Sequence, residues 1–228
     1  MKSFLFKFLV TICLAQIVSC TQQTEMSVFH TKNQAYSSTP RLLVVPKPSA
    51  QFVVLHPNTL EKELQIDRGL TDIMLKLFWA GLLSPLSQSK IKLKPSDKQL
   101  VLDITPVNAS ISQDFQIKAF LPPQTLNTTS NVDSYLIIHE WSLGYGLTAK
   151  GFYDLNKSRE ISEPGKARTL NTVLSYSVWD SKNAQVIQHG VVEAGIPRSS
   201  SWQTEDFKSL AIKLNLELHR QLGGVDNE

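Results

Sequence analysis

The sequence predicts an α+β fold, a two-layer sandwich in which a mixed or antiparallel sheet packs against two main helices. Two amphipathic runs, from Asn58 to Ser84 and from Glu205 to Leu222, have the periodicity of helices. Between them lie several short apolar runs separated by turn residues, which is typical of antiparallel strands. Helices and consecutive antiparallel strands bury their apolar faces together when they form two packed layers.

Short apolar runs predict the first strands of the sheet. Residues Arg41 to Pro46 form a continuous apolar stretch that is typical of a strand buried on both faces. Phe52 to Leu55 predicts a second strand, and Leu100 to Ile104 predicts a third. Between residues 108 and 130 we expect a loop with local strand, because Pro122 and Pro123 exclude a central strand.

The first predicted helix extends from Asn58 to about Ser84. Asn58, with Glu61 three residues later, resembles a capping box, and Gly81 lies near the helix end. Asp72 and Lys76 interrupt the most apolar part, so we expect a helix packed on the core rather than a membrane span. The apolar side chains at helical spacing are Ile66, Leu70, Ile73, Met74, Leu77 and Phe78.

The strongest strand pattern covers Tyr135 to Leu143. Regular alternation would place on one face of the sheet the side chains of Tyr135, Ile137, His139, Trp141 and Leu143. A hairpin is predicted next, with strands from Thr169 to Trp179 and from Val186 to Ala194 joined by the turn formers at 180–184. In the closing helix, Thr204 is the expected cap and Gly223 marks the end.

The first twenty residues have the pattern of a secretory signal. Lys2 and Lys7 supply a positive end, an apolar run follows, and the segment closes on Ile17-Val18-Ser19-Cys20. A cysteine directly after a small residue resembles a lipobox, the motif after which bacterial lipoproteins are cleaved and lipidated. The resemblance implies that Cys20 carries lipid; a plain secreted protein and a retained membrane anchor are the alternatives.

These features divide the chain into four predicted segments. Residues 1–19 form the signal, Cys20 and a polar, flexible tether occupy 20–39, a single α+β domain covers 40–224, and 225–228 form a tail. The chain has two cysteines, of which Cys13 is removed with the signal and Cys20 is blocked by lipid. We therefore expect no disulfide and no thiol chemistry in the domain.

Charge gives little indication of partners. Removal of the signal takes away two lysines and no acidic residue, which lowers the formal net charge from +3 to +1. No basic block of the kind that binds nucleic acid is present. We interpret the densest basic stretch as a solvated loop or an edge strand, with a phosphate or lipid-headgroup contact as the alternative; its members are Lys90, Lys92, Lys94 and Lys98.

No sequence motif predicts catalysis. The nucleophile elbow G-x-S-x-G, the zinc motif H-E-x-x-H and the glycine-rich nucleotide-binding loops are missing from the sequence. His139 and His189 would approach each other if their strands are neighbours, but two ligands do not make a metal site. We therefore expect no catalytic residue, no metal and no cofactor.

Aromatic side chains provide one candidate partner surface. Trp141, Tyr145, Trp179 and Trp202 are candidates for the ends of the sheet, where an exposed member would mark a partner surface or a sugar-stacking platform. Burial in the core is the alternative for each of them. Tyr176 and Trp179, three residues apart, would lie on opposite faces of a regular strand.

The order of elements resembles that of certain envelope lipoproteins. Over residues 40–222, the segments at 131–138, 174–180 and 186–190 are similar to those of proteins with a domain like the amino-terminal domain of TolB, such as CsgG-like and LpoB-like proteins. The auxiliary lipoproteins of ABC-type lipid transporters share this arrangement. Neither resemblance carries over a catalytic residue.

Together these features predict a non-enzymatic envelope lipoprotein, attached to the membrane by lipid, that binds another envelope protein as an assembly, scaffold or regulatory factor. The alternative is an auxiliary lipoprotein of an ABC-type lipid transport system that binds a small or lipidic ligand. Thr21, rather than aspartate, follows the lipid site. This residue favours the outer membrane, with the domain facing the periplasm.

Overall fold

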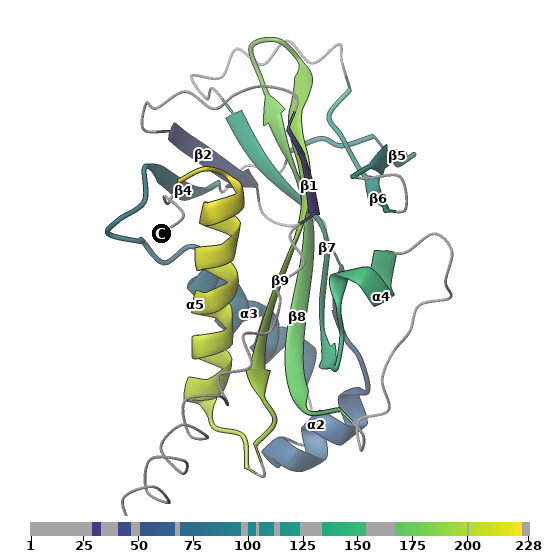
Figure 1. Ribbon diagram of the computed structural model, residues 1–228, viewed down its shortest axis with the longest axis vertical. Coiled ribbons are helices and arrows are strands. Elements are labelled where there is room, and N and C mark those ends of the chain that lie inside the picture. The colour runs from purple at the N-terminus through teal and green to yellow at the C-terminus, as the bar shows by residue number, and fades with distance from the viewer. Residues whose placement is uncertain are drawn as a thin grey trace, which may run out of the picture.

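The chain folds as the predicted α+β structure (Figure 1). A mixed sheet of seven strands packs against two main helices on one face, and a smaller two-stranded sheet and a short helix lie against the other. The signal, Cys20 and the tail at 225–228 lie outside the described residues. The computed structural model describes residues 29–32, 41–46, 51–66, 69–96, 100–103, 105–111, 115–123, 134–153, 167–199 and 201–224.

Three long antiparallel strands form the centre of the sheet: β7 (Ser134–Tyr145), β8 (Thr169–Asp180) and β9 (Gln185–Pro197). The predicted hairpin between β8 and β9 is confirmed. In its turn, the Asp180 carboxylate accepts hydrogen bonds from the backbone N–H groups of Lys182 and Asn183, at 2.8 and 3.2 Å. This local bonding helps to fix the register of β8 against β9.

Parallel strands complete the side of the sheet beyond β7. β2 (Arg41–Pro46) and β3 (Gln51–Val54), both predicted, pair with successive parts of β7, and β4 (Ile91–Ser96) pairs with β2 at the edge. Lys92 and Lys94 are exposed on β4. The edge-strand interpretation of this basic stretch is therefore confirmed, although Lys98 lies outside the described residues.

The predicted boundary between tether and domain is wrong. β1 (Phe29–Lys32) lies within the segment expected to be a flexible tether, yet it pairs antiparallel with β9 at the other edge of the sheet. The backbone hydrogen bonds of an edge strand can hold a polar sequence that has little apolar surface of its own. The folded domain therefore includes residues that precede residue 40.

The first predicted helix is two helices, α2 (Pro57–Leu64) and α3 (Leu70–Leu82). Gln65 and Gly69 take left-handed backbone conformations, with φ of 56° and 79°, and this geometry ends one helix before the next begins. The predicted capping box at Asn58 is also wrong, because the residue that caps α2 is His56. Among the described residues, no helix is long and apolar enough to span a membrane.

The closing helix, α5 (Thr204–Gln221), begins one residue earlier than predicted. Gln203 rather than Thr204 is its cap, and the Asp206 carboxylate accepts a hydrogen bond from the Gln203 backbone N–H at 2.7 Å. Gly223, as predicted, ends the helix with a positive φ of 74°. The stripe of apolar residues on α5 packs onto the sheet.

The second face of the sheet is covered in part by the segment expected to be a loop with local strand. β5 (Val107–Ser110) and β6 (Gln116–Ala119) form a two-stranded sheet there, next to the short helix α4 (Ala149–Tyr153) (Figure 1). The strand predicted from Leu100 to Ile104 is not formed over its described part, residues 100–103. The Asp103 N–H donates a hydrogen bond to the Leu121 carbonyl at 2.8 Å, an isolated contact rather than a ladder.

A bulge in β7 changes which side chains face the helices. The register with β8 shifts between Ile138 and Glu140, so that His139 is the extra residue. Tyr135 therefore faces the second side of the sheet, whereas Trp141 and the residues that alternate with it face the helices. The predicted shared face from Tyr135 to Leu143 is wrong, because one inserted residue reverses the alternation.

The helices α3 and α5 approach each other closely at a glycine. A Cβ atom placed on Gly81 would lie 2.4 Å from the Ala211 Cβ, a distance that real side chains do not reach. Near this crossing, Phe78 packs edge-on against Trp141, with ring centroids 5.8 Å apart. Glycine at position 81 thus allows the two helices to pack together over the sheet.

We expect Gly81→Ala to lower the free energy of unfolding by about 1–3 kcal/mol, because overpacking outweighs the gain in helix propensity of about 1 kcal/mol. Urea denaturation at neutral pH measures the change. The exchange variant, Gly81→Ala with Ala211→Gly, restores the space and should recover part of the loss. An unchanged or increased stability of Gly81→Ala would contradict the close approach of the helices.

Candidate functional site

The prediction that four aromatic residues form a partner surface is wrong. Trp141, Tyr145, Trp179 and Trp202 are only 1%, 0%, 4% and 6% exposed, so none of them offers a free aromatic face. Each ring fills a space in the core, where large aromatic side chains contribute most apolar area. The alternative, burial of all four, is the one that the structure supports.

The four residues also do not form one group. Trp141 packs against Phe52 and Phe78 beneath the helices, and its indole N–H donates a hydrogen bond to Thr172 Oγ1 at 2.9 Å. Trp179 lies on the second face of the sheet, opposite Tyr176, as the spacing of these two residues predicts. Tyr145 and Trp202, in contrast, meet at the end of the sheet.

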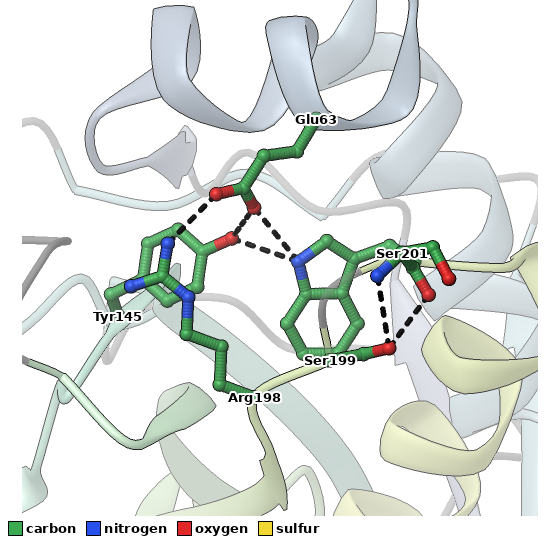
Figure 2. A network of polar contacts seen from close by, with 6 residues as sticks. Glu63, Tyr145, Arg198, Ser199 and Ser201 are labelled. Atoms are coloured by element: carbon green, nitrogen blue, oxygen red, sulfur yellow. Dashed lines mark hydrogen bonds and ion pairs between the residues drawn. The ribbon is translucent and has the colours of Figure 1, made fainter.

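Tyr145 and Trp202 belong to a polar cluster that sequence reasoning missed (Figure 2). Glu63 comes from α2, Tyr145 from the end of β7, and Arg198 and Trp202 from the connection between β9 and α5. We call these four residues the Glu63 cluster. Three segments far apart in the chain meet there, and no local motif in the sequence marks the meeting point.

All the donors of the Glu63 cluster converge on one carboxylate. The Tyr145 hydroxyl and the Trp202 indole N–H donate to Glu63 Oε2, the latter at 2.9 Å. Arg198 donates from Nη2 to Glu63 Oε1 at 2.8 Å. The indole N–H also lies 2.8 Å from the Tyr145 hydroxyl oxygen, and the guanidinium carbon lies 4.7 Å from the centre of the Tyr145 ring.

A small serine turn precedes the indole. The Ser199 hydroxyl donates to the Ser201 carbonyl at 2.7 Å and accepts a hydrogen bond from the Ser201 N–H at 3.2 Å (Figure 2). Such side-chain turns give a short loop a defined backbone path without a helix or strand. Arg198 and Trp202, on the two sides of this turn, are thereby directed to the same carboxylate.

The electrostatics of the Glu63 cluster favour holding a negative charge. Burial acts to raise the pKa of Glu63, but hydrogen bonds from Tyr145, Trp202 and Arg198 outweigh it, and the pKa lies below the usual 4.5. Burial and the adjacent carboxylate raise the pKa of Tyr145 to about 12. At neutral pH the cluster therefore contains a carboxylate and a neutral phenol, an arrangement suited to binding rather than proton transfer.

A second cluster lies on the opposite face of the sheet. Ser177 Oγ is 2.6 Å from His139 Nε2 and 2.7 Å from His189 Nδ1. The backbone N–H of Phe120, beyond β6, donates to His139 Nδ1 at 3.2 Å. The expected proximity of the two histidines is thus present, and a buried serine bridges them.

The backbone donor fixes the direction of this chain of hydrogen bonds. Because His139 Nδ1 accepts from Phe120, the neutral ring carries its proton on Nε2 and donates it to Ser177. The Ser177 hydroxyl then donates to His189 Nδ1. Burial lowers the pKa of His139 to about 3, with a further lowering by His189, so the ring stays neutral.

The hydrogen bonds between Ser177 and the two histidines resemble the serine–histidine pair of hydrolases, but the serine here is not accessible. Ser177 is fully buried at 0% exposure, so its hydroxyl has no contact with solvent from which a substrate would approach. Instead, the hydrogen bonds join the segment after β6 to β8 and β9. Within the part of the chain that is described, no group of three or more side chains could hold a metal ion.

Comparisons with known proteins do not assign the chain to a family. No protein-family model and no curated protein matches it. Among solved structures, it is similar to the PelC dodecamer from Paraburkholderia phytofirmans (TM-score 0.31, 11% identity, covering 85% of this chain and 97% of that chain). A hypothetical protein from Chlamydia trachomatis gives a TM-score of 0.32 at 10% identity, covering 80% and 93%. Scores this low do not establish a shared fold.

The buried histidine His139 makes the stability of the domain depend on pH. Between its ordinary value of 6.5 and about 3, the unfolded chain binds a proton that the folded protein does not. The free energy of unfolding should therefore fall as pH falls below 6.5, by up to about 1.4 kcal/mol per pH unit from this residue. The buried His219, with a pKa lowered to about 4, acts in the same direction.

Urea denaturation between pH 7 and pH 4 measures this slope. The slope of the unfolding free energy against pH should be shallower in His139→Asn, because unfolding then takes up about one proton fewer. This holds whatever the change in stability at pH 7. His56→Asn, at an exposed position, is the matched control for the loss of a histidine. An equal slope in His139→Asn and wild type would show that His139 is not held neutral in the fold.

Proposed function

We propose that this chain is a lipid-anchored protein of a bacterial cell envelope that binds another envelope protein without catalysing a reaction. One observation carries the proposal: the run Ile17-Val18-Ser19-Cys20 closes a segment that begins with lysines and continues as an apolar stretch. A protein with this segment is exported, and lipid on Cys20 would hold the domain at a membrane surface. Several acyl chains on one cysteine give stable attachment, whereas one chain gives only marginal binding.

The two polar clusters support a binding role for the domain. The Glu63 carboxylate is fully engaged by three donors of the same chain, and Ser177 is buried between two histidines. These contacts hold segments together and keep their groups in one protonation state.

Outer-membrane attachment, with the domain in the periplasm, is part of the proposal. Thr21 follows the proposed lipid site, in place of the aspartate that retains many enterobacterial lipoproteins at the inner membrane. The assembly, scaffold or regulatory role follows from anchoring, because a protein confined to one membrane surface meets its partners at a raised local concentration.

Metabolic labelling with an alkyne analogue of palmitate tests the anchor. The wild type and Cys13→Ala should incorporate the label and sediment with membranes, because Cys13 lies inside the removed signal. Cys20→Ala should lose the label and the lipid-dependent attachment. Labelling of Cys20→Ala at the level of the wild type, or no labelling of the wild type, would refute the proposed lipidation.

The same strains test the partner. A photo-crosslinking residue at Ile73 or Ile212, exposed at 44% and 48% on the two main helices, samples one face of the domain. Val101 and Val107, exposed at 64% and 49%, sample segments on the other side. A discrete protein adduct at some of these positions, reduced in Cys20→Ala, is the expected result. Intact envelopes that yield no protein adduct at any position would contradict the binding role.

A further inference from the structure

The Glu63 cluster has the composition of a carboxylate-binding site that the chain fills by itself. Tyr145, Arg198 and Trp202 all donate to the same carboxylate, and none of the three belongs to the helix that carries it. Arginine matches the planar geometry of a carboxylate, and here its guanidinium lies over the Tyr145 ring. We call these three donors the carboxylate cradle, and they come from β7 and from the β9–α5 connection rather than from α2.

The helix that supplies Glu63 is short and has a small apolar contact with the core. α2 has eight residues, of which Leu60 is buried and Leu64 packs against the core while partly buried. The residues at its two ends, His56 and Gln65, have left-handed backbones with φ of 54° and 56°, although neither is glycine. Residues other than glycine adopt this backbone conformation at an energetic cost, so α2 carries backbone strain at both ends.

The carboxylate cradle is accessible from solvent. The side chains of Glu63 and Arg198 are 25% and 28% exposed, whereas Tyr145 and Trp202 form the buried floor. A carboxylate from outside could therefore replace that of Glu63 without passing through the apolar core. Burial of Tyr145 and Trp202 also strengthens the hydrogen bonds that these two donors make to a carboxylate.

We propose that the carboxylate cradle is a recognition site for an acidic segment of a protein partner, and that Glu63 occupies it until the partner carboxylate takes its place. That the ligand is a segment of a protein rests on the proposed function. That the ligand is a carboxylate rests only on the three donors of the cradle. Attached to the same chain, Glu63 has a high effective concentration, so a free small carboxylate competes poorly with it. A partner segment succeeds because it adds contacts of its own.

Acetate binding to Glu63→Ala tests the cradle directly. The full chain is purified in detergent, and the indole ¹⁵N–¹H NMR signal of Trp202 is followed during titration at constant ionic strength with chloride as the balancing salt. Glu63→Ala should bind acetate at least about a hundredfold more tightly than the wild type, which retains its own carboxylate. Glu61→Ala, on the same helix, is the matched control and should behave as the wild type does.

Two further variants keep the test decisive. Adding Arg198→Ala to Glu63→Ala should abolish acetate binding, and Glu63→Gln, which keeps the side-chain shape, should bind acetate more tightly than the wild type even if Glu63→Ala fails to fold. No acetate response in Glu63→Ala or Glu63→Gln would overturn the carboxylate site. These readouts use no membrane and no partner, so they are independent of the labelling and crosslinking results.

Replacement of Glu63 is tested in the wild type with an octaglutamate peptide. Hydrogen exchange in residues 57–64 should accelerate as the peptide binds, because α2 loses its main polar attachment. Octaglutamine is the uncharged control and should have no effect. Unchanged exchange in α2 at millimolar octaglutamate, with acetate binding intact in Glu63→Ala, would show that the cradle serves Glu63 alone and would overturn the proposal.

Discussion

One inserted residue in β7 determines how the rest of the domain is arranged. The bulge at His139 reverses the alternation of the strand. Even-numbered residues face the helices before the bulge, and odd-numbered residues face them after it. Trp141 thereby enters the core beneath α3, and Tyr145 emerges on the side where α2 lies. Without the reversal, the Tyr145 hydroxyl would point to the far face of the sheet, away from Glu63.

The same bulge explains why the two faces of the sheet carry different polar clusters. His139 remains on the second face, where it receives the Phe120 N–H and reaches Ser177. Its ring attaches the covering segment to the strands, whereas the Glu63 cluster attaches α2 to the strand end and to the β9–α5 connection. Each face is thus closed by a hydrogen-bonded cluster in addition to its apolar contacts, and each cluster stays in one protonation state because of burial or of charge.

The sequence predicted the features that depend on neighbouring residues, and it did not predict those that depend on contacts between distant residues. Local signals predicted the α+β class, the β8–β9 hairpin and the end of α5 at Gly223, because turn residues and periodicity act within a few positions. The break between α2 and α3 depends on left-handed residues, one of them Gln65, which no propensity marks. The meeting of Glu63 with Arg198 joins positions 135 residues apart and follows only from tertiary packing. Cys20 and its lipobox stay predictions, since they lie outside the described residues.

A titration of the Glu63 side-chain carboxyl by ¹³C NMR measures the interaction on which the site depends. Three donors from two other segments should keep the carboxylate charged, so its midpoint should fall below the ordinary 4.5. Removing the Tyr145 hydroxyl, with Tyr145→Phe, should move the midpoint upward. A Glu63 pKa at or above 4.5 in the wild type would contradict the convergence of Tyr145, Arg198 and Trp202 on this group.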